Sequence, residues 1–251
     1  MTIKAYAKVN IFLKIVGTRD NYHELLSRFM RVENLYDTIS FEKKEVESKA
    51  FELVGDFGCK LEQNTIYKAY KLLPENSFFD SHKVVVKKNI PEFAGLGGGS
   101  SNAAAFLNLV NKVLELGFSY DKLATMGAKI GADVPFFIYN YPSANVSGIG
   151  EIVEAFDEDP LNIETITPKI ECDTAKVYQK YRSDYLDTID LEFAQKLSKL
   201  TSSEILKSYE AKSLNDLFPP CLELYEDLKT YKKPNWFFSG SGSTFFRIDN
   251  G

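Results

Sequence analysis

The sequence predicts an α+β fold. In the 251-residue chain, segments with the pattern of strands cluster first and helical segments are mixed in later. Residues 3–16 alternate between apolar and polar side chains, which is typical of a half-buried strand. The Ala- and Leu-rich residues 103–116 have the spacing of a helix that ends near Gly117. This order favours α+β over a regular array of βαβ units.

The remaining elements follow from local signals in chain order. A run rich in β-branched residues predicts a strand at 83–87, and Pro74 and Gly131 end two predicted helices. The stretch 140–159 is rich in Pro, Gly, Ser and acidic residues, so we expect two domains, 1–150 and 151–251. We expect strands at 3–16, 32–41, 83–87, 134–139 and 163–170, a hairpin at 236–248, and helices at 64–73, 103–116, 122–130, 174–182, 192–200, 202–210 and 222–231.

Composition indicates an ordinary cytoplasmic enzyme. The net charge is -5, and acidic and basic residues are interspersed. Lysine pairs such as 87–88 and 232–233 are expected to be solvated edges, so no nucleic-acid partner is predicted. Three widely spaced cysteines favour reduced thiols over a disulfide framework. No apolar run approaches the roughly 20 residues of a membrane span, so no membrane partner is predicted either. The oligomeric state stays open.

A glycine-rich loop is the strongest functional signal. The first glycine loop, Gly95-Leu96-Gly97-Gly98-Gly99-Ser100-Ser101, lies between the 83–87 strand and the Ala-rich helix. Glycines let the backbone approach a ligand, and the first helical turn offers free N–H groups to an anion such as phosphate. A P-loop would need Lys followed by Ser or Thr, and a dinucleotide fingerprint would need a third spaced glycine where Asn102 stands. The loop therefore predicts a phosphate site of another kind.

The segment 91–117 resembles the second motif of the GHMP kinases. Residues 5–13 and 238–244 look like the first and third motifs, in the family's order. Segments 7–10, 21–25 and 130–135 are similar to the branch of the family that phosphorylates a cytidine diphosphate sugar alcohol. The resemblance implies a ribosomal-S5-domain-2-like first half and a ferredoxin-like second half. It also implies ATP as cosubstrate, with Mg²⁺ held mainly through the nucleotide phosphates, and the sequence assigns no particular residue as a metal ligand.

The resemblance implies a catalytic pair and a triphosphate site. Asp133 would accept the hydroxyl proton, Lys8 would keep Asp133 ionised and orient the hydroxyl, and the first glycine loop would hold the triphosphate. Ser100 or Ser101 could add a hydroxyl contact. The residues alone leave other interpretations open, because Asp133 could bond the turn backbone and Lys8 could be a solvated lysine. Asn10 could hold the substrate or bond across the sheet.

The same resemblance implies a cytosine pocket. Tyr22 and Tyr178 would stack on the two faces of the base, and His23 would bond its edge. Tyr22 and His23 follow a turn-like cluster and could instead be a surface turn, and Tyr178 could pack in a helical core. Thr174 would either cap its helix or touch the diphosphate. Asn64 could approach the nucleotide or simply be an N-cap.

A second glycine loop, residues 239–244, matches the third family motif. The resemblance implies that Gly240, Ser241 and Gly242 close the site near the substrate, although a plain hairpin turn would use the same residues. Some residues depart from the family pattern: Ser243 and Thr244 in this loop, and Asp173 and Ala175 where relatives often have prolines. Relatives commonly continue beyond Gly251 with another helix and strand, so a protein that ended at Gly251 would have a shorter sheet edge or one covered by another subunit.

Two other classes of function remain open at this point. Another GHMP kinase, acting on homoserine or mevalonate, would make Tyr22 and His23 incidental. A non-catalytic nucleotide-binding module would need neither Lys8 nor Asp133, so the presence of both residues argues against it.

Overall fold

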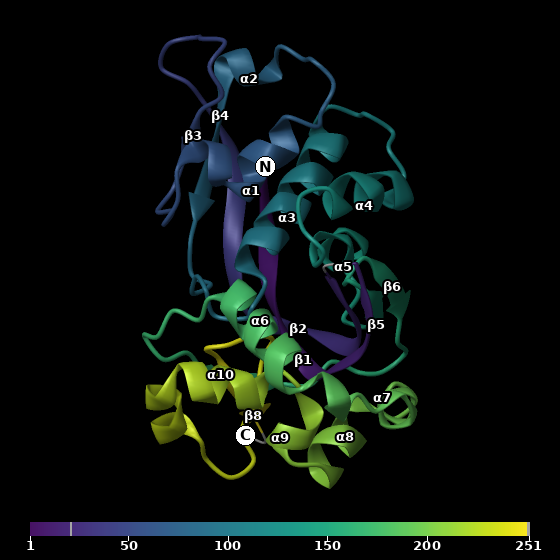
Figure 1. The fold of residues 1–251 in the computed structure, drawn as a ribbon. Helices are drawn as coiled ribbons and strands as arrows, with labels where there is room; N and C mark the ends of the chain where they lie inside the picture. Colours follow the sequence, from purple (N-terminus) through teal and green to yellow (C-terminus); the bar gives the residue numbers. More distant parts are fainter. Residues whose placement is uncertain (21, 250–251) are drawn as a thin grey trace. The chain divides into compact units, whose positions relative to one another are not determined.

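The computed structural model describes residues 1–20 and 22–249. Asn21 of the 21–25 motif and the chain end at Gly251 lie outside them. The described chain divides into two compact units that interleave along the sequence, and strands β1 and β2 contribute residues to both (Figure 1). The expected domains 1–150 and 151–251 stay a prediction. The first unit comprises Met1–Ala7, Leu35–Ile90 and Gly98–Asn140, and the second comprises Lys8–Asn34, Pro91–Gly97 and Tyr141–Gly251.

The first unit combines a sheet with a group of helices. The end of β2 pairs antiparallel with β4, and β4 pairs parallel with β3. The ring of Phe106 on α3 lies edge-on to Phe41 of β2, which packs helix against sheet. Helix α3 also contacts α1 and α5, and α5 contacts α4. The elements are β1 (Thr2–Arg19) and β2 (Tyr22–Lys43) in part, β3 (Leu53–Val54), η1 (Leu61–Gln63), α1 (Thr65–Tyr70), α2 (Phe78–Ser81), β4 (His82–Lys87), α3 (Gly98–Val113), α4 (Tyr120–Ala128) and α5 (Val134–Tyr139).

The second unit carries a three-stranded antiparallel sheet and several short helices. In that sheet β9 lies between β7 and β8. Separately, Leu25–Met30 of β2 pairs antiparallel with β5, and β5 pairs with β6. The elements, besides the rest of β1 and β2, are β5 (Ser143–Gly148), β6 (Ile152–Ala155), β7 (Ile163–Ile166), α6 (Thr174–Asp184), η2 (Leu186–Thr188), α7 (Leu191–Leu197), α8 (Ser202–Ser208), α9 (Ala211–Leu214), α10 (Phe218–Leu224), η3 (Glu226–Tyr231), β8 (Phe237–Phe238) and β9 (Phe245–Ile248).

Most predicted elements are confirmed with shifted ends, but the strand expected at 134–139 is wrong. These residues form helix α5, which has a proline in its first turn and ends at Asn140 in the left-handed conformation. Every residue of Val134–Ile138 is buried, so the run has no polar positions to reveal its period. A short apolar run of this kind does not distinguish a buried strand from a buried helix.

Three smaller expectations are also corrected. The helix expected at 222–231 is two elements, because α10 ends at Leu224 and a 3-10 helix follows. Tyr22 and His23 begin the long strand β2 instead of lying in a turn. Strand β1 is not half-buried along its length, because both of its faces are buried from Ala7 to Leu13. None of the described helices is both long and apolar enough to cross a membrane.

Candidate active site

Lys8 and Asn10 of β1 lie in the interior of the second unit. Their exposed fractions are 4% and 1%. The Lys8 ammonium donates to Asn10 Oδ1 at 2.6 Å and to the Gly95 carbonyl at 3.0 Å, and it lies 4.6 Å from the centre of the Phe29 ring. The interpretation of Lys8 as a solvated lysine is therefore wrong. Asn10 Nδ2 donates to Ser27 Oγ on β2 at 2.9 Å, so Asn10 does bond across the sheet.

The start of the first glycine loop meets the second glycine loop beside Lys8. The backbone N–H of Lys8 donates to the Leu96 carbonyl at 3.0 Å, and Ser239 Oγ donates to the Gly95 carbonyl at 3.0 Å. Gly95 has φ +74°, and a Cβ added there would lie 2.2 Å from the Ser239 carbonyl oxygen. A Cβ added to Gly240 would lie 3.2 Å from the carbonyl oxygen of Gly95. Only glycine allows this close approach of two backbones.

Asn215 holds the second glycine loop and was missed from the sequence. Its Nδ2 donates to the carbonyls of Phe238 and Gly240, each at 2.9 Å, and its Oδ1 accepts from the Leu217 N–H. The residue is 2% exposed. It precedes Asp216, whose N–H donates to the Leu13 carbonyl of β1. No spacing in the sequence connects this asparagine to a loop more than twenty residues later.

The rest of the first glycine loop opens helix α3 in the first unit. The helix begins at Gly98 within the glycine run and continues for 16 residues, so its first N–H groups belong to the loop. Thr65 Oγ1 donates to the Gly99 carbonyl at 2.7 Å. Ser100 is half-buried, whereas Ser101 is buried and lines a separate cavity of about 300 Å³. Asn64 is the N-cap of α1, since its side chain accepts from the Ile66 N–H.

Asp133 sits at the N-cap position of α5, but its side chain makes no capping hydrogen bond. The turn that carries it lies beside the start of α3, because a Cβ on Gly131 would be 3.6 Å from Ser100 Oγ. Asp133 is therefore presented near the helical turn that would bind phosphate, within the first unit. Lys8 belongs to the second unit, and its pairing with Asp133 stays a prediction.

A buried polar cluster braces the start of α3 and was also missed. Asp37 of β2 is fully buried and accepts from Lys88 Nζ at 2.5 Å and from Asn102 Nδ2 at 2.8 Å. It also accepts from the N–H groups of Asn89 and Ile90. The expectation that Lys88 is a solvated edge residue is wrong, because Lys88 is paired with a buried carboxylate. Asn102, which follows the first glycine loop, thus anchors the start of α3 to Asp37 of β2.

His23 and Tyr178 come together in the second unit. Their ring centroids are 5.2 Å apart and tilted by 33°, and Tyr181 lies edge-on to the same imidazole. Burial, and then the nearby Arg182 charge, lower the pKa of His23 from its ordinary value. Among the residues that the structure describes, its buried Nε2 has no hydrogen-bond partner. Tyr22 is 62% exposed and Tyr178 is only half-buried, so neither is a core residue.

The start of α6 joins this region to the second glycine loop. Asp173 caps the helix by accepting from the N–H groups of Ala175 and Lys176. The alternative that Thr174 is the cap is therefore wrong. Thr174 Oγ1 instead lies 2.7 Å from Ser241 Oγ.

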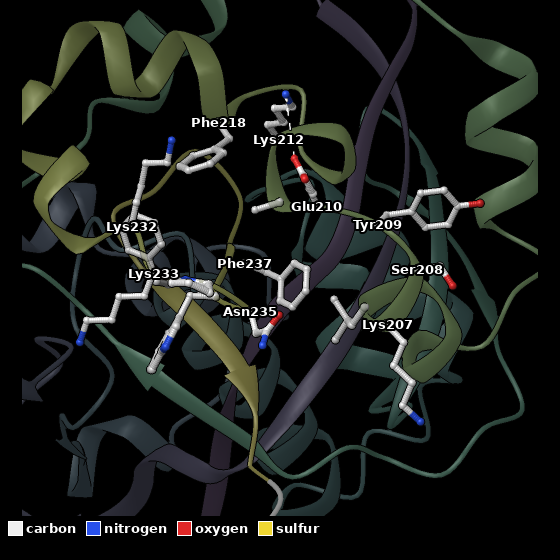
Figure 2. Close-up of a pocket in the computed structure, with 15 residues that line it drawn as sticks. Lys207, Ser208, Tyr209, Glu210, Lys212, Phe218, Lys232, Lys233, Asn235 and Phe237 are labelled. Atoms are coloured by element: carbon white, nitrogen blue, oxygen red, sulfur yellow. Dashed lines mark ion pairs between the residues drawn. The ribbon is translucent and has the colours of Figure 1, made fainter.

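A separate cavity of about 450 Å³ lies in the second unit (Figure 2). Four lysines line it together with aromatic side chains such as Phe218 and Phe237. None of the predicted site residues is among the residues that line it. This cavity is therefore not part of the candidate active site.

Similarity to known proteins identifies the family. Residues 64–141, which include Asn64, the whole first glycine loop and Asp133, match the model of the GHMP kinases N terminal domain. The chain is 54% identical to the 4-diphosphocytidyl-2-C-methyl-D-erythritol kinase of Sulfurimonas denitrificans over 98% of this chain and 96% of that protein. The corresponding protein of Sulfurovum sp. is 53% identical, with 98% of each chain covered.

Solved structures agree. A crystal structure of 4-(cytidine 5'-diphospho)-2C-methyl-D-erythritol kinase superposes with a TM-score of 0.74 at 28% identity, and the match covers 100% of this chain and 91% of that one. The mevalonate kinase of Methanococcus jannaschii shares the fold at 15% identity, with a TM-score of 0.62 over 100% of this chain and 90% of that one. The chain thus has the GHMP kinase fold, and it belongs to the 4-diphosphocytidyl-2-C-methyl-D-erythritol kinase family.

Proposed function

We propose that this protein transfers the γ-phosphoryl group of ATP to the 2-hydroxyl of 4-diphosphocytidyl-2-C-methyl-D-erythritol, giving the 2-phosphate and ADP. The reaction would be a cytoplasmic step of the non-mevalonate route to isoprenoid precursors. The observation that carries the proposal is the buried cluster of Lys8, Asn10 and Gly95 against the second glycine loop, in a chain of this family.

The first glycine loop and the start of α3 hold the triphosphate. Phosphate binds at helix N-termini because free N–H groups and the helix dipole both favour an anion. Glycine at positions 97–99 would let the backbone approach phosphate oxygens closely, and half-buried Ser100 is better placed than the buried Ser101 to add a hydroxyl. Mg²⁺, held mainly through the phosphates, would neutralise the charge on the transferring group. Asn64 precedes α1 and would approach the nucleotide through its neighbour Thr65.

Asp133 accepts the proton of the attacking hydroxyl, and Lys8 orients that hydroxyl. Asp133 lies at the N-cap position of α5, in the turn beside the start of α3. An ammonium near a carboxylate favours the ionised form of both groups, so Lys8 would keep Asp133 in its basic form. Asn10 Oδ1 accepts a hydrogen bond from the Lys8 ammonium, and the Asn10 side chain would contact the substrate beside Lys8.

The base-binding side rests on three aromatic residues. Tyr22 and Tyr178 stack on cytosine, and the Nε2 of His23, which has no hydrogen-bond partner among the described residues, supplies an edge hydrogen bond. The hydrogen bond between Thr174 and Ser241 links the start of α6 to the second glycine loop. Gly240, Ser241 and Gly242 of that loop would contact the substrate beside its diphosphate. A buried polar atom without a partner is costly unless a ligand satisfies it, which supports a ligand role for His23.

The test is Mg²⁺-dependent ADP release measured with 4-diphosphocytidyl-2-C-methyl-D-erythritol, homoserine and mevalonate in parallel. Saturable turnover with the cytidyl substrate alone is the expected result. Turnover only with another alcohol would reject the cytosine pocket and keep the phosphate chemistry. ATP binding without turnover of any of the three would instead indicate a nucleotide-binding module.

A further inference from the structure

Two buried thiols meet beneath the second glycine loop. Cys172 and Cys221 are 2% and 0% exposed, and their sulfur atoms are 3.6 Å apart, which is van der Waals contact. Both are free thiols. Cys59, the third cysteine, is exposed and lies in the other unit. The wide spacing of the three cysteines in the sequence predicts separate reduced thiols, but two of them are neighbours.

The thiol pair contacts the backbone of the second glycine loop directly. Cys221 Sγ donates to the Ser241 carbonyl at 3.2 Å. A Cβ added to Gly242 would lie 3.1 Å from the Cys172 sulfur and 3.2 Å from the Cys221 sulfur. Cys172 also stands two residues before Thr174, the partner of Ser241 Oγ. Any change in the two sulfurs is therefore transmitted to the backbone at Ser241 and Gly242.

We propose that Cys172 and Cys221 are an oxidative modification site, at which a peroxide forms a reversible disulfide that shifts the second glycine loop. The effect on kinase activity rests on the proposed function, because it assumes that this loop contacts the cytidyl substrate. The disulfide itself does not depend on that assumption.

The chemistry begins at Cys172. The neighbouring Cys221 thiol lowers the pKa of Cys172, whereas contact with Cys172 and burial raise the pKa of Cys221. The Cys172 thiolate attacks one peroxide oxygen, the O–O bond breaks, and a sulfenic acid and water form after protonation. The Cys221 sulfur then attacks the Cys172 sulfur, an S–S bond forms, and the sulfenic oxygen leaves as the second water. Two thiols are oxidised to one disulfide as one peroxide is reduced to two waters.

The disulfide has a defined consequence for the loop. The sulfurs must approach to about 2 Å, which moves at least one of them relative to the backbone at Gly242 that both now contact. Cys221 also loses its S–H proton, so the Ser241 carbonyl loses its donor. Loss of one hydrogen bond corresponds to about a fivefold change in an equilibrium. We therefore expect oxidation to raise the KM of the cytidyl substrate about fivefold, with a smaller change in the KM of ATP.

The experiment treats the full chain with hydrogen peroxide, alkylates the remaining thiols after denaturation, and maps disulfide-linked peptides by mass spectrometry. C59S is the matched control because it removes the exposed thiol and leaves the pair intact. The wild type and C59S should both give the Cys172–Cys221 linkage, and dithiothreitol should restore the original KM. C172A and C221A should give no linkage, and peroxide should leave their KM unchanged, with thermal unfolding used to confirm that each variant is folded.

Two results would overturn the proposal. One is that both buried thiols are still alkylated while Cys59 is oxidised. The other is that the linkage forms in C59S without a shift in the cytidyl KM beyond about twofold. If the protein turns over no cytidyl substrate at all, peptide mapping still decides the linkage, and hydrogen exchange at residues 239–244 then reports the loop. Equal exchange in the oxidised and reduced protein would contradict the proposal.

Discussion

At the level of single residues, Lys8 illustrates how a site residue differs from a surface one. A buried ammonium is costly unless its donors are satisfied, and Lys8 Nζ has the Asn10 amide oxygen, the Gly95 carbonyl and the Phe29 ring around it. These contacts hold the side chain in one orientation. A fixed cation is suited to aligning a hydroxyl for transfer, because alignment is most of what an enzyme contributes to phosphoryl transfer.

Replacing Asp133 with Asn should reduce kcat with the cytidyl substrate by about 10²–10⁴-fold, the usual contribution of a general base. The amide keeps the size of the side chain but does not accept the proton. D56N is the matched control, since Asp56 is an exposed carboxylate of the same unit. Steady-state kinetics for both variants check the prediction, and unchanged turnover in D133N would remove Asp133 from the role of base.

His23 should make stability depend on pH below about 6.5. Its pKa is lowered in the folded protein, so the unfolded chain takes up the proton first as pH falls. Stability from this group is thus complete above the ordinary value of 6.5 and is lost as pH drops towards the lowered pKa. We expect the melting temperature of H23Q to fall less steeply over this range than that of the wild type.

The control for this prediction is H82Q, because His82 is the only other histidine in the chain. H82Q keeps the burial of His23 and should retain the steep wild-type slope. Melting curves recorded at a series of pH values for the three proteins decide the matter. Equal slopes for H23Q and H82Q would contradict the assignment.

At the level of elements, the two glycine loops depend on backbone contact that side chains would prevent. Ala at Gly95 combines a positive φ with a collision at 2.2 Å from the Ser239 carbonyl. Gly117 has a similar φ of +67°, but a Cβ there meets nothing within 4 Å. Comparing an alanine substitution at Gly117 with one at Gly95 therefore separates the effect of backbone strain from the effect of losing the contact between Gly95 and Ser239.

We expect G117A to cost about 1–2 kcal/mol, the strain of a left-handed residue, and to leave kcat and KM unchanged. G95A should cost more and should also reduce kcat, because the two loops must separate beside Lys8. Urea unfolding and ADP release measure the two effects. Equal losses of stability and activity in the two variants would show that the contact between Gly95 and Ser239 is unimportant.

For the whole molecule, the sequence predicted elements with local signals correctly, but it did not predict features that depend on the packing around them. The α3 helix follows from glycines before an alanine-rich run, and the 236–248 hairpin follows from its glycines, because such signals are local. Whether the run at 134–139 is a helix or a strand is not a local property, since burial on all sides removes the polar positions that reveal a period. Tertiary packing decided that segment.

The candidate site shows the same division. Lys8, Asn10 and Gly95 were predicted by motif and are brought together in the second unit. Asn215, Asp37 and Lys88 were not, because each acts through a partner distant in sequence and carries no special spacing. Supporting residues of this kind become visible only when the chain is folded.

The last prediction concerns the stability of the second unit. Arg28 on β2 is fully buried and reaches Glu158 Oε1 at 3.2 Å, the Ser198 carbonyl at 2.9 Å and Asn145 Oδ1 at 2.8 Å. Burial lowers the pKa of the guanidinium, and Glu158 opposes that change. One side chain thus ties β2 to β5 and to the segment between α7 and α8.

Removing one partner of such a pair leaves a buried charge without compensation, so R28A should lower the free energy of unfolding by about 3–5 kcal/mol. R247A is the matched control, because the Arg247 side chain is 47% exposed in its pair with Glu164 and should cost only about 0–1 kcal/mol. In R28A/E158A the remaining charge is gone as well, so the double variant should lose less stability than the two single variants added together. Urea denaturation of the wild type and of the four variants R28A, E158A, R28A/E158A and R247A measures these differences. If R28A were no more destabilised than R247A, Arg28 would not be the residue that holds these elements together.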